Sequence, residues 1–216
     1  MAGLGMNFKS IGLIFLILIA LDDFVPLIGL SLIPHDVVAA PEPRSEPLQG
    51  MDKPSRTPWS EVRRGSVFVM TPRAAYDISA RVADRDHYRW SAVDALMPWD
   101  LVLTWGRLVD EPYRSKISYV HTRRFYNWGT DDGSLDMNYV NGHSANVHLA
   151  AANGRVASAL TRVRAGDVVR LEGDLIDITG PDAFNWKTSM TRTDTGSGAC
   201  ETMYVRAVTI GTSRYH

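Results

Sequence analysis

The sequence predicts an α+β fold that is mainly β, in which a small antiparallel barrel with short helices follows an N-terminal membrane segment. Three observations predict it: the chain starts with a strongly apolar segment, stretches of alternating apolar and polar residues recur further on, and one of these stretches changes phase next to a glycine. The 216 residues are 45% hydrophobic and 22% charged, a composition typical of one globular domain plus an appendage.

Residues 1–33 contain two apolar runs separated by Asp22 and Asp23. Neither run alone reaches the roughly 20 residues that a helix needs to cross a bilayer, but together they do. Each aspartate then costs about 2.5 to 3.5 kcal/mol if it is charged within the membrane. We interpret the segment as an uncleaved anchor. A cleaved signal peptide, with its cleavage site at the small residues 38–40, and a buried helix of a soluble protein are the alternatives.

Lys9 is the only basic residue of this segment, and positive charge favours the cytoplasmic side of a membrane span. The predicted location is therefore the cell inner membrane, crossed once, with the C-terminal domain on the periplasmic or extracytoplasmic side. Residues 34–58 hold six prolines and few large apolar residues, which predicts an extended linker. A β-rich globular domain is predicted over residues 59–212.

Within that domain, strict period-two alternation predicts strands over residues 76–82 and 184–190. Residues 169–178 also alternate, but the apolar set changes phase after Asp174, next to Gly173, which indicates a β-bulge or a sharp bend. Further strands are predicted at residues 66–70, 117–128 and 203–210. Capping residues and helical spacing predict two short helices, one from Ser91 to about Met97 and one after Asn153.

Residues 163–173 (VRAGDVVRLEG) combine a Gly-Asp turn with a strand that carries a central glycine, a pattern that resembles the barrels of the OB-fold. The segments WGRL (residues 105–108), HSANVHL (143–149) and GACE (198–201) resemble a family of uncharacterised bacterial membrane-associated proteins. The resemblance spans residues 76–208. It implies the OB-like architecture and no particular activity.

The charge balance and the cysteine count exclude several classes of protein. The formal net charge is −1, so no excess of positive charge predicts a polyanionic partner, and no nucleic acid is expected. Cys200 is the only cysteine, which excludes an intramolecular disulfide, a thiolate metal cluster and a lipid-modified N-terminal cysteine. No cofactor and no metal are predicted.

No convergent catalytic set stands out, and the weak candidates for catalysis are His143, His148, Asp194 and Cys200. Asp194 begins a DTG tripeptide like that of aspartic proteases, but the sequence has one copy, without the flanking apolar strands. Cys200 with a histidine would suit a nucleophile and its base. His143 and His148 would lie on opposite faces of a regular strand, so a shared metal would need an irregular backbone.

Arg123, Arg124 and Trp128 place charge and an aromatic ring together on a predicted strand, as barrels that bind single-stranded nucleic acid do, and are the candidate ligand-binding residues. The leading hypothesis is a membrane-anchored, extracytoplasmic binding or scaffold protein, with the membrane and another envelope protein or a small ligand as partners. One alternative is a hydrolase-like enzyme that uses His143 and His148 with Asp194 or Cys200. The other is an oligonucleotide-binding barrel.

Overall fold

Strand β4 (Ser66–His87) is the longest element of the computed structural model, which describes residues 33–50, 56–192, 194, 196 and 198–216. It includes both segments that were predicted separately, at residues 66–70 and 76–82. The alternation of buried and exposed side chains continues from the first segment into the second. The predicted membrane anchor lies outside the described residues, apart from Ile33. No described helix has the length and apolarity that a bilayer crossing requires.

Five strands of the sheet pair in a closed cycle. In chain order they are β4, β5 (Trp99–Thr104), β8 (Ser144–Ala151), β9 (Val168–Thr179) and β11 (Glu201–Ile210). The cycle arises because β11 pairs with β8 on one side and with β9 on the other, while β4 pairs with β5 and β9, and β5 pairs with β8.

The mainly β fold class is as predicted, but the sheet differs from the small antiparallel barrel that the sequence indicated. Further strands extend it to ten, and β8 and β11 run parallel, so the sheet is mixed. Parallel neighbours need a long crossover, which residues 152–200 supply. The added strands are β1 (Asp36–Val37), β2 (Leu48–Gly50), β3 (Trp59–Arg63), β10 (Asn185–Trp186) and β12 (Ser213–Tyr215).

The region predicted as an extended linker, residues 34–58, contributes two of these strands. β1 pairs with β12 and β2 pairs with β4, so this part of the chain belongs to the same compact unit, residues 35–216, as the rest of the domain. Backbone hydrogen bonds at a sheet edge need no apolar side chains, which is why composition gave no sign of this pairing.

Both predicted helices are present. Ser91 caps α2 (Ala92–Leu96) with a capping box to Asp94, and the Asn153 side chain caps α5 (Gly154–Arg162). Three short helical segments were not predicted: η2 (Gly106–Val109), α3 (Tyr113–Lys116) and α4 (Met137–Gly142). Each is too short for a helical period to show in the sequence.

The single strand predicted at residues 117–128 is a hairpin, formed by β6 (Ser118–Thr122) and β7 (Phe125–Gly129). Its turn consists of Arg123 and Arg124, whose φ angles are +49° and +69°. Two-residue hairpin turns of this kind usually carry asparagine or glycine, which tolerate positive φ, so the arginines concealed the turn.

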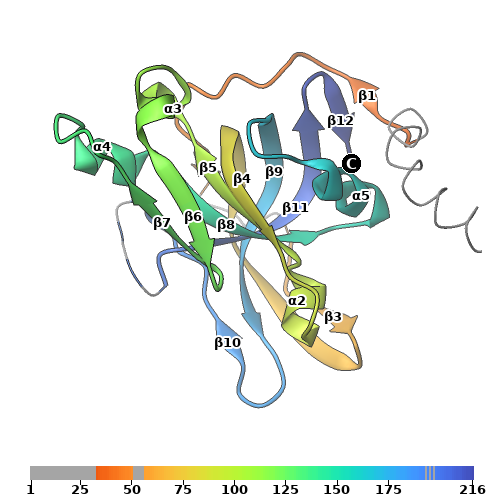
Figure 1. Ribbon diagram of the computed structural model, residues 1–216. Coiled ribbons are helices and arrows are strands. Elements are labelled where there is room, and N and C mark those ends of the chain that lie inside the picture. Colours follow the sequence, from red (N-terminus) through yellow and green to blue (C-terminus); the bar gives the residue numbers. More distant parts are fainter. Residues whose placement is uncertain (1–32, 51–55, 193, 195, 197) are drawn as a thin grey trace, which may run out of the picture. The chain divides into compact units, whose positions relative to one another are not determined.

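Leu171, Leu175 and Ile78 are fully buried, as their period-two pattern predicts, and Ile78 is paired with Leu171 across β4 and β9. Trp186, from the alternating segment over residues 184–190, packs half-buried against a second cluster that includes Phe68 and Ile178. The cluster includes side chains of α2, β3 and β10, elements that lie at the lower end of the sheet in Figure 1.

The change of phase in β9 coincides with an irregularity in its neighbour β4. Register shifts between Pro72 and Ala74, opposite Leu175, and the side chains beyond this bulge join the second cluster. Gly173 is required by close packing, because a Cβ at this position would overlap the carbonyl oxygen of Tyr204 on β11.

Candidate functional site

The outer face of β5, β8 and β11 is polar and yet buried. Cross-strand register places Asp100 beside His148, and His148 beside Thr202, and each of these side chains is at most 1% exposed. Alternate residues such as Leu101 and Val147 fill the inner face. Polar groups so far from water need partners. Arg124 of the β6–β7 hairpin and Trp186 supply hydrogen bonds to Asp100 and Thr202, whereas Asp100 Oδ2 and His148 Nδ1 make none with a described residue.

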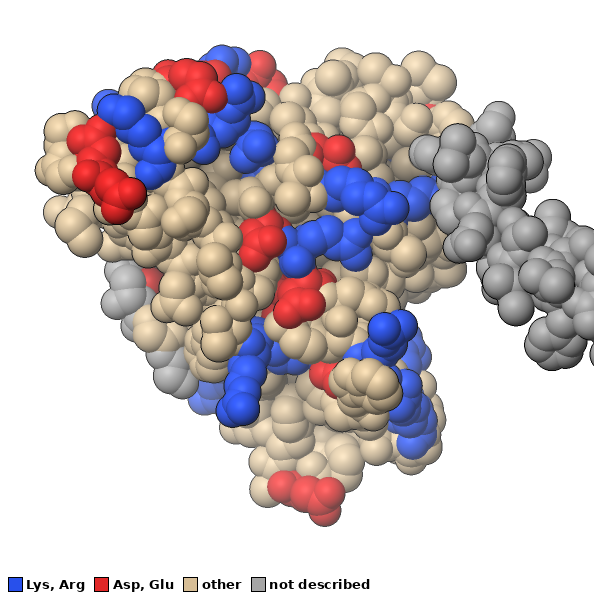
Figure 2. Space-filling model, viewed as in Figure 1, with Lys and Arg blue, Asp and Glu red and all other residues tan. Residues whose placement is uncertain are grey.

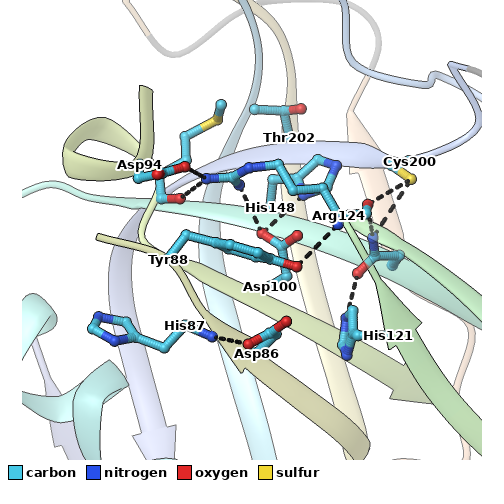
Figure 3. A network of polar contacts seen from close by, with 12 residues as sticks. Asp86, His87, Tyr88, Asp94, Asp100, His121, Arg124, His148, Cys200 and Thr202 are labelled. Atoms are coloured by element: carbon cyan, nitrogen blue, oxygen red, sulfur yellow. Dashed lines mark hydrogen bonds and ion pairs between the residues drawn. The ribbon is translucent and has the colours of Figure 1, made fainter. Parts of the chain in front are cut away.

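The β6–β7 hairpin covers this face with the side chain of Arg124 (Figure 3). The guanidinium donates from Nη2 to Asp94 Oδ1 at 2.7 Å and to the Met97 carbonyl oxygen at 3.0 Å, and from Nη1 to Asp100 Oδ1 at 3.1 Å. The ring of Tyr88 lies 4.3 Å away, and its hydroxyl accepts from the Arg124 backbone amide. These contacts offset the strain of an L-residue at positive φ, about 1–2 kcal/mol.

The positive charge of Arg124 changes the pKa of its acidic partner Asp94. Burial by itself raises the pKa of Asp94, but hydrogen bonds from Arg124 and Ser91 outweigh it and bring the pKa down to about 2. Asp94 also holds the start of α2 through the backbone amides of Trp90 and Ser91. The same carboxylate therefore fixes both the helix and the hairpin.

Two histidines, His148 on β8 and His121 on β6, belong to the same network of polar contacts. His148 Nδ1 lies 2.9 Å from Asp100 Oδ1, and its ring meets the edge of Trp186. His121 bonds to Asp84 through Nδ1 at 3.0 Å and to Asn146 Oδ1 through Nε2 at 3.1 Å. Strands β4, β5, β6 and β8 are thereby connected through side chains as well as through the sheet.

Asn146 links this hydrogen-bond network to Cys200. Its Nδ2 donates to the Arg124 carbonyl oxygen at 2.7 Å and to Cys200 Sγ at 3.6 Å. Burial raises the pKa of Cys200 to about 11, although the hydrogen bond from Asn146 lowers it, so the thiol stays protonated at neutral pH. Cys200 is therefore poorly suited to act as a nucleophile.

A cavity of about 510 Å³ opens between the hairpin and the loop before β11. One wall consists of β7 and the start of β8, and the other of the loop and Glu201. Hydrogen bonds from Tyr126 Oη to Ser144 and from Trp128 Nε1 to Asn141 Oδ1 hold the first wall. The lining residues are Phe125, Tyr126, Asn127, Trp128, Asn141, Ser144, Ala145, Asn146, Thr191, Arg192, Asp194, Gly196, Ala199, Cys200 and Glu201.

Glu201 lines this cavity while being only 3% exposed. Burial raises its pKa to about 8; the nearby charge of Asp194 adds to the rise and that of Arg192 opposes it. Its Oε2 atom accepts no hydrogen bond from any described part of the chain. At neutral pH the cavity therefore holds a mostly uncharged carboxyl group with an unused polar atom.

A smaller cavity, of about 230 Å³, lies next to the first and shares Phe125 and Cys200 with it. Arg124, His148, Trp186 and Lys187 belong to its lining. Both cavities thus border the buried polar face, the larger at Asn146 and the smaller at His148.

The predicted catalytic residues do not converge. His143 lies apart, stacked on Tyr139 and 3.0 Å from Glu46 Oε1, and lines neither cavity. His148 and Cys200 both line the smaller cavity, but no hydrogen bond joins Cys200 to a histidine within the described ranges. Asp194 lines the larger cavity and accepts a hydrogen bond from Ser189, and the described lining holds no second aspartate of the kind that proteases pair with it.

The predicted ligand-binding residues separate in a similar way. Arg123 is exposed at the tip of the hairpin, Arg124 is turned inward, and Trp128 lines the larger cavity. Among the residues that the structure describes, no group of acids, histidines and cysteine is placed to hold a metal ion.

Sequence reasoning missed Asp100, Asn146 and Glu201, which are central to the site. Each had a signal: Asp100 is the single acid in the apolar run WDLVLT, and Glu201 precedes the predicted strand over residues 203–210. In HSANVHL the residues Ser144, Asn146 and His148 alternate with apolar ones, the pattern of a strand, and the segment is β8. Comparison of the chain with protein-family models, curated proteins and solved structures gave no match.

Proposed function

We propose that this chain is a membrane-anchored binding protein without catalytic activity, whose domain binds a small ligand, or a segment of an envelope protein, in the cavity lined by Glu201. Its N-terminus anchors it in the cell inner membrane, and the domain lies on the extracytoplasmic side. The observation that carries the proposal is the 510 Å³ cavity with a buried carboxyl oxygen that has no hydrogen-bond partner in the described chain, a size and a polar group typical of small-molecule sites.

The proposal includes an OB-like barrel as the scaffold. The closed cycle of five strands supports it, together with the helix α5 between the third and fourth strands of the cycle. OB-folds bind ligands on the face of their second and third strands and with the loops that join strands one to two and four to five. In this chain those parts are β5, β8 and the loops 88–98 and 180–200, and the larger cavity borders both β8 and the second loop.

The two alternative functions have less support. An oligonucleotide needs a positively charged groove, but Arg124 is bound to two carboxylates. On the face shown in Figure 2, basic and acidic side chains are interspersed and much of the surface is uncharged. The hydrolase-like alternative needs His143 and His148 to meet Asp194 or Cys200, but His143 lines neither cavity, and burial raises the pKa of the Cys200 thiol.

The binding proposal is tested with the full-length chain in lipid nanodiscs, screened by ligand-observed NMR against a library of small polar compounds. Ala199→Trp places a large ring in the cavity lining, and Ser134→Trp places the same ring on an exposed loop outside it. Compounds that bind the parent chain should lose binding to the first variant and keep it with the second. A library in which no compound distinguishes the two variants contradicts the proposal.

The localisation is tested separately. A reporter enzyme that is active only outside the cytoplasm, fused after Gly50, should be active, and deletion of residues 1–33 should release the chain from carbonate-washed membranes. Activity of a cytoplasmic reporter at the same junction, with the first reporter silent, contradicts the orientation.

A further inference from the structure

We propose that the larger cavity takes an uncharged, polyhydroxylated ligand, such as a neutral sugar unit of a glycan, with Glu201 as a hydrogen-bond donor to one of its hydroxyl groups. This inference rests on the proposed binding function and adds the chemical class of the ligand. Three features of the lining support this inference: the balance of its charged residues, its aromatic rings and the protonation state of Glu201.

The charges in the lining leave little attraction for a charged ligand. Arg192 is the only basic residue among the described lining residues. Its Nη2 donates to the Pro47 carbonyl oxygen at 2.8 Å, whereas its Nε, 3.9 Å from Glu46 Oε2, makes no hydrogen bond with a described residue. Asp194 carries the opposite charge in the same lining. A phosphate or carboxylate ligand would lose its hydration to meet a single guanidinium that is partly occupied and shares the lining with the Asp194 carboxylate.

The remaining lining suits hydroxyl groups on an otherwise apolar ring. The side-chain amide of Asn127 and the Nδ2 group of Asn141 provide donors and an acceptor, which match the dual character of a hydroxyl. Asn141 Oδ1 already accepts from Trp128, and Ser144 Oγ already donates to the Val140 carbonyl oxygen. Phe125 and Trp128 lie in the same lining, and Phe125 is 48% exposed. Aromatic rings offer an apolar surface on which the C–H face of a sugar ring packs.

Glu201 completes this arrangement from the buried side of the cavity. A carboxyl group that stays protonated near neutral pH donates a hydrogen bond, as carboxylic acids held in apolar sites do. Its Oε2 atom is buried and has no partner in the described chain, so a ligand hydroxyl in the cavity would satisfy it. Since its pKa is about 8, this donor is lost in moderately alkaline solution.

The experiment uses the full-length chain in nanodiscs and isothermal titration calorimetry. The probes are tri-N-acetylchitotriose and maltotriose, which are neutral, and trigalacturonate, which is a charged trisaccharide of similar size. At pH 6 a neutral probe should bind more tightly than trigalacturonate. Between pH 6 and pH 9 the affinity should fall about tenfold, because only about one molecule in eleven keeps the Glu201 proton at pH 9.

Three variants identify the groups responsible. Glu201→Gln keeps a donor at every pH and should remove the pH dependence. Trp128→Ala should weaken binding at least tenfold, while Trp128→Phe, which keeps an aromatic ring, should weaken it less. Trp90→Ala is the matched control, because Trp90 is 83% exposed and lies outside the cavity, and it should change affinity less than twofold. Circular dichroism checks that each variant is folded.

Tighter binding of trigalacturonate, or equal affinities for the Trp128→Ala and Trp90→Ala variants, would overturn the assignment of the ligand class. The assignment of the ligand class is also overturned if no trisaccharide binds while compounds from the NMR screen still bind at the site blocked by Ala199→Trp. In that case the binding function itself stands. If neither trisaccharides nor library compounds bind, both proposals fail.

Discussion

At the scale of single residues, the site depends on charges that are buried with their partners. Asp100 is fully buried between Arg124 and His148, and the Arg124 guanidinium connects it to Asp94 on α2. Replacing one member of a buried ion pair leaves the charge of the other member unpaired in a medium of low polarity. Arg124 should therefore matter much more for stability than its exposed neighbour Arg123.

We expect Arg124→Ala to lower the free energy of unfolding by about 3–5 kcal/mol, because it leaves Asp100 and Asp94 without their cation. Arg123→Ala, at the same hairpin turn but with an exposed side chain, should change it by no more than about 0.5 kcal/mol. Urea denaturation of the two variants measures both values. Similar losses in the two would show that turn geometry, and not the buried ion pairs, sets the stability.

Glu201 makes stability depend on pH in a predictable direction. Its folded-state pKa of about 8 lies above its ordinary value of 4.5, so the folded chain binds the proton more tightly than the unfolded chain. The free energy of unfolding should fall, by at most a few kcal/mol, as pH rises from about 4.5 to 8. Glu201→Gln should flatten this part of the profile, as measured by urea denaturation at several pH values. An unchanged profile would contradict the assignment.

At the scale of elements, the two faces of β9 differ in what they contribute. Leu171 lies fully buried against Ile78 of β4, whereas Arg170 faces outward and forms a two-pronged ion pair with Asp77 at 2.9 and 2.6 Å. The pair is partly exposed to solvent, which screens it. Apolar burial on the inner face should therefore dominate.

We expect Leu171→Ala to lower the free energy of unfolding by about 2–5 kcal/mol, since it removes buried methyl groups and leaves a void. Arg170→Ala should cost no more than about 1 kcal/mol, the usual range for an exposed ion pair. Denaturant melts of the two variants, adjacent in sequence and opposite in orientation, make the comparison. Equal losses would mean that β9 does not have one buried and one solvated face in this region.

At the scale of the whole molecule, closure of the strand cycle depends on β11. It pairs with β8 in parallel and with β9 in antiparallel orientation, so it connects parts of the chain that are far apart in sequence. Glu201 and Cys200, which line the larger cavity, lie at the start of this strand or next to it. Loss of β11 should thus remove both the closed sheet and the site.

Truncation of the chain before Glu201 should abolish cooperative unfolding, because β8 and β9 then each keep an open edge and the apolar inner face is exposed to water. Truncation after Ile210 removes β12, a strand of three residues between β11 and the two-residue strand β1, and should leave a cooperative transition at a lower midpoint. Thermal denaturation followed by near-ultraviolet circular dichroism distinguishes the two. A cooperative transition in the shorter chain would contradict the role of β11.

The sequence by itself determined the features that depend on local patterns. Period-two alternation located the buried face of β4 and β9, side-chain caps located α2 and α5, and the phase change beside Gly173 located an irregularity where β4 carries a bulge. These signals are local because solvent exposure alternates within one strand and a cap bonds to backbone three residues away.

Only the tertiary structure decided which polar residues form the site. Asp100, Arg124, His148 and Cys200 are distributed over a hundred positions and meet because β5, β8 and β11 are neighbours and the β6–β7 hairpin folds over them. Residue types alone could not separate His148, bound to Asp100, from His143, bound to Glu46. Burial and pairing set the charge state of Glu201 and Cys200, and both arise from contacts between segments that no local pattern records.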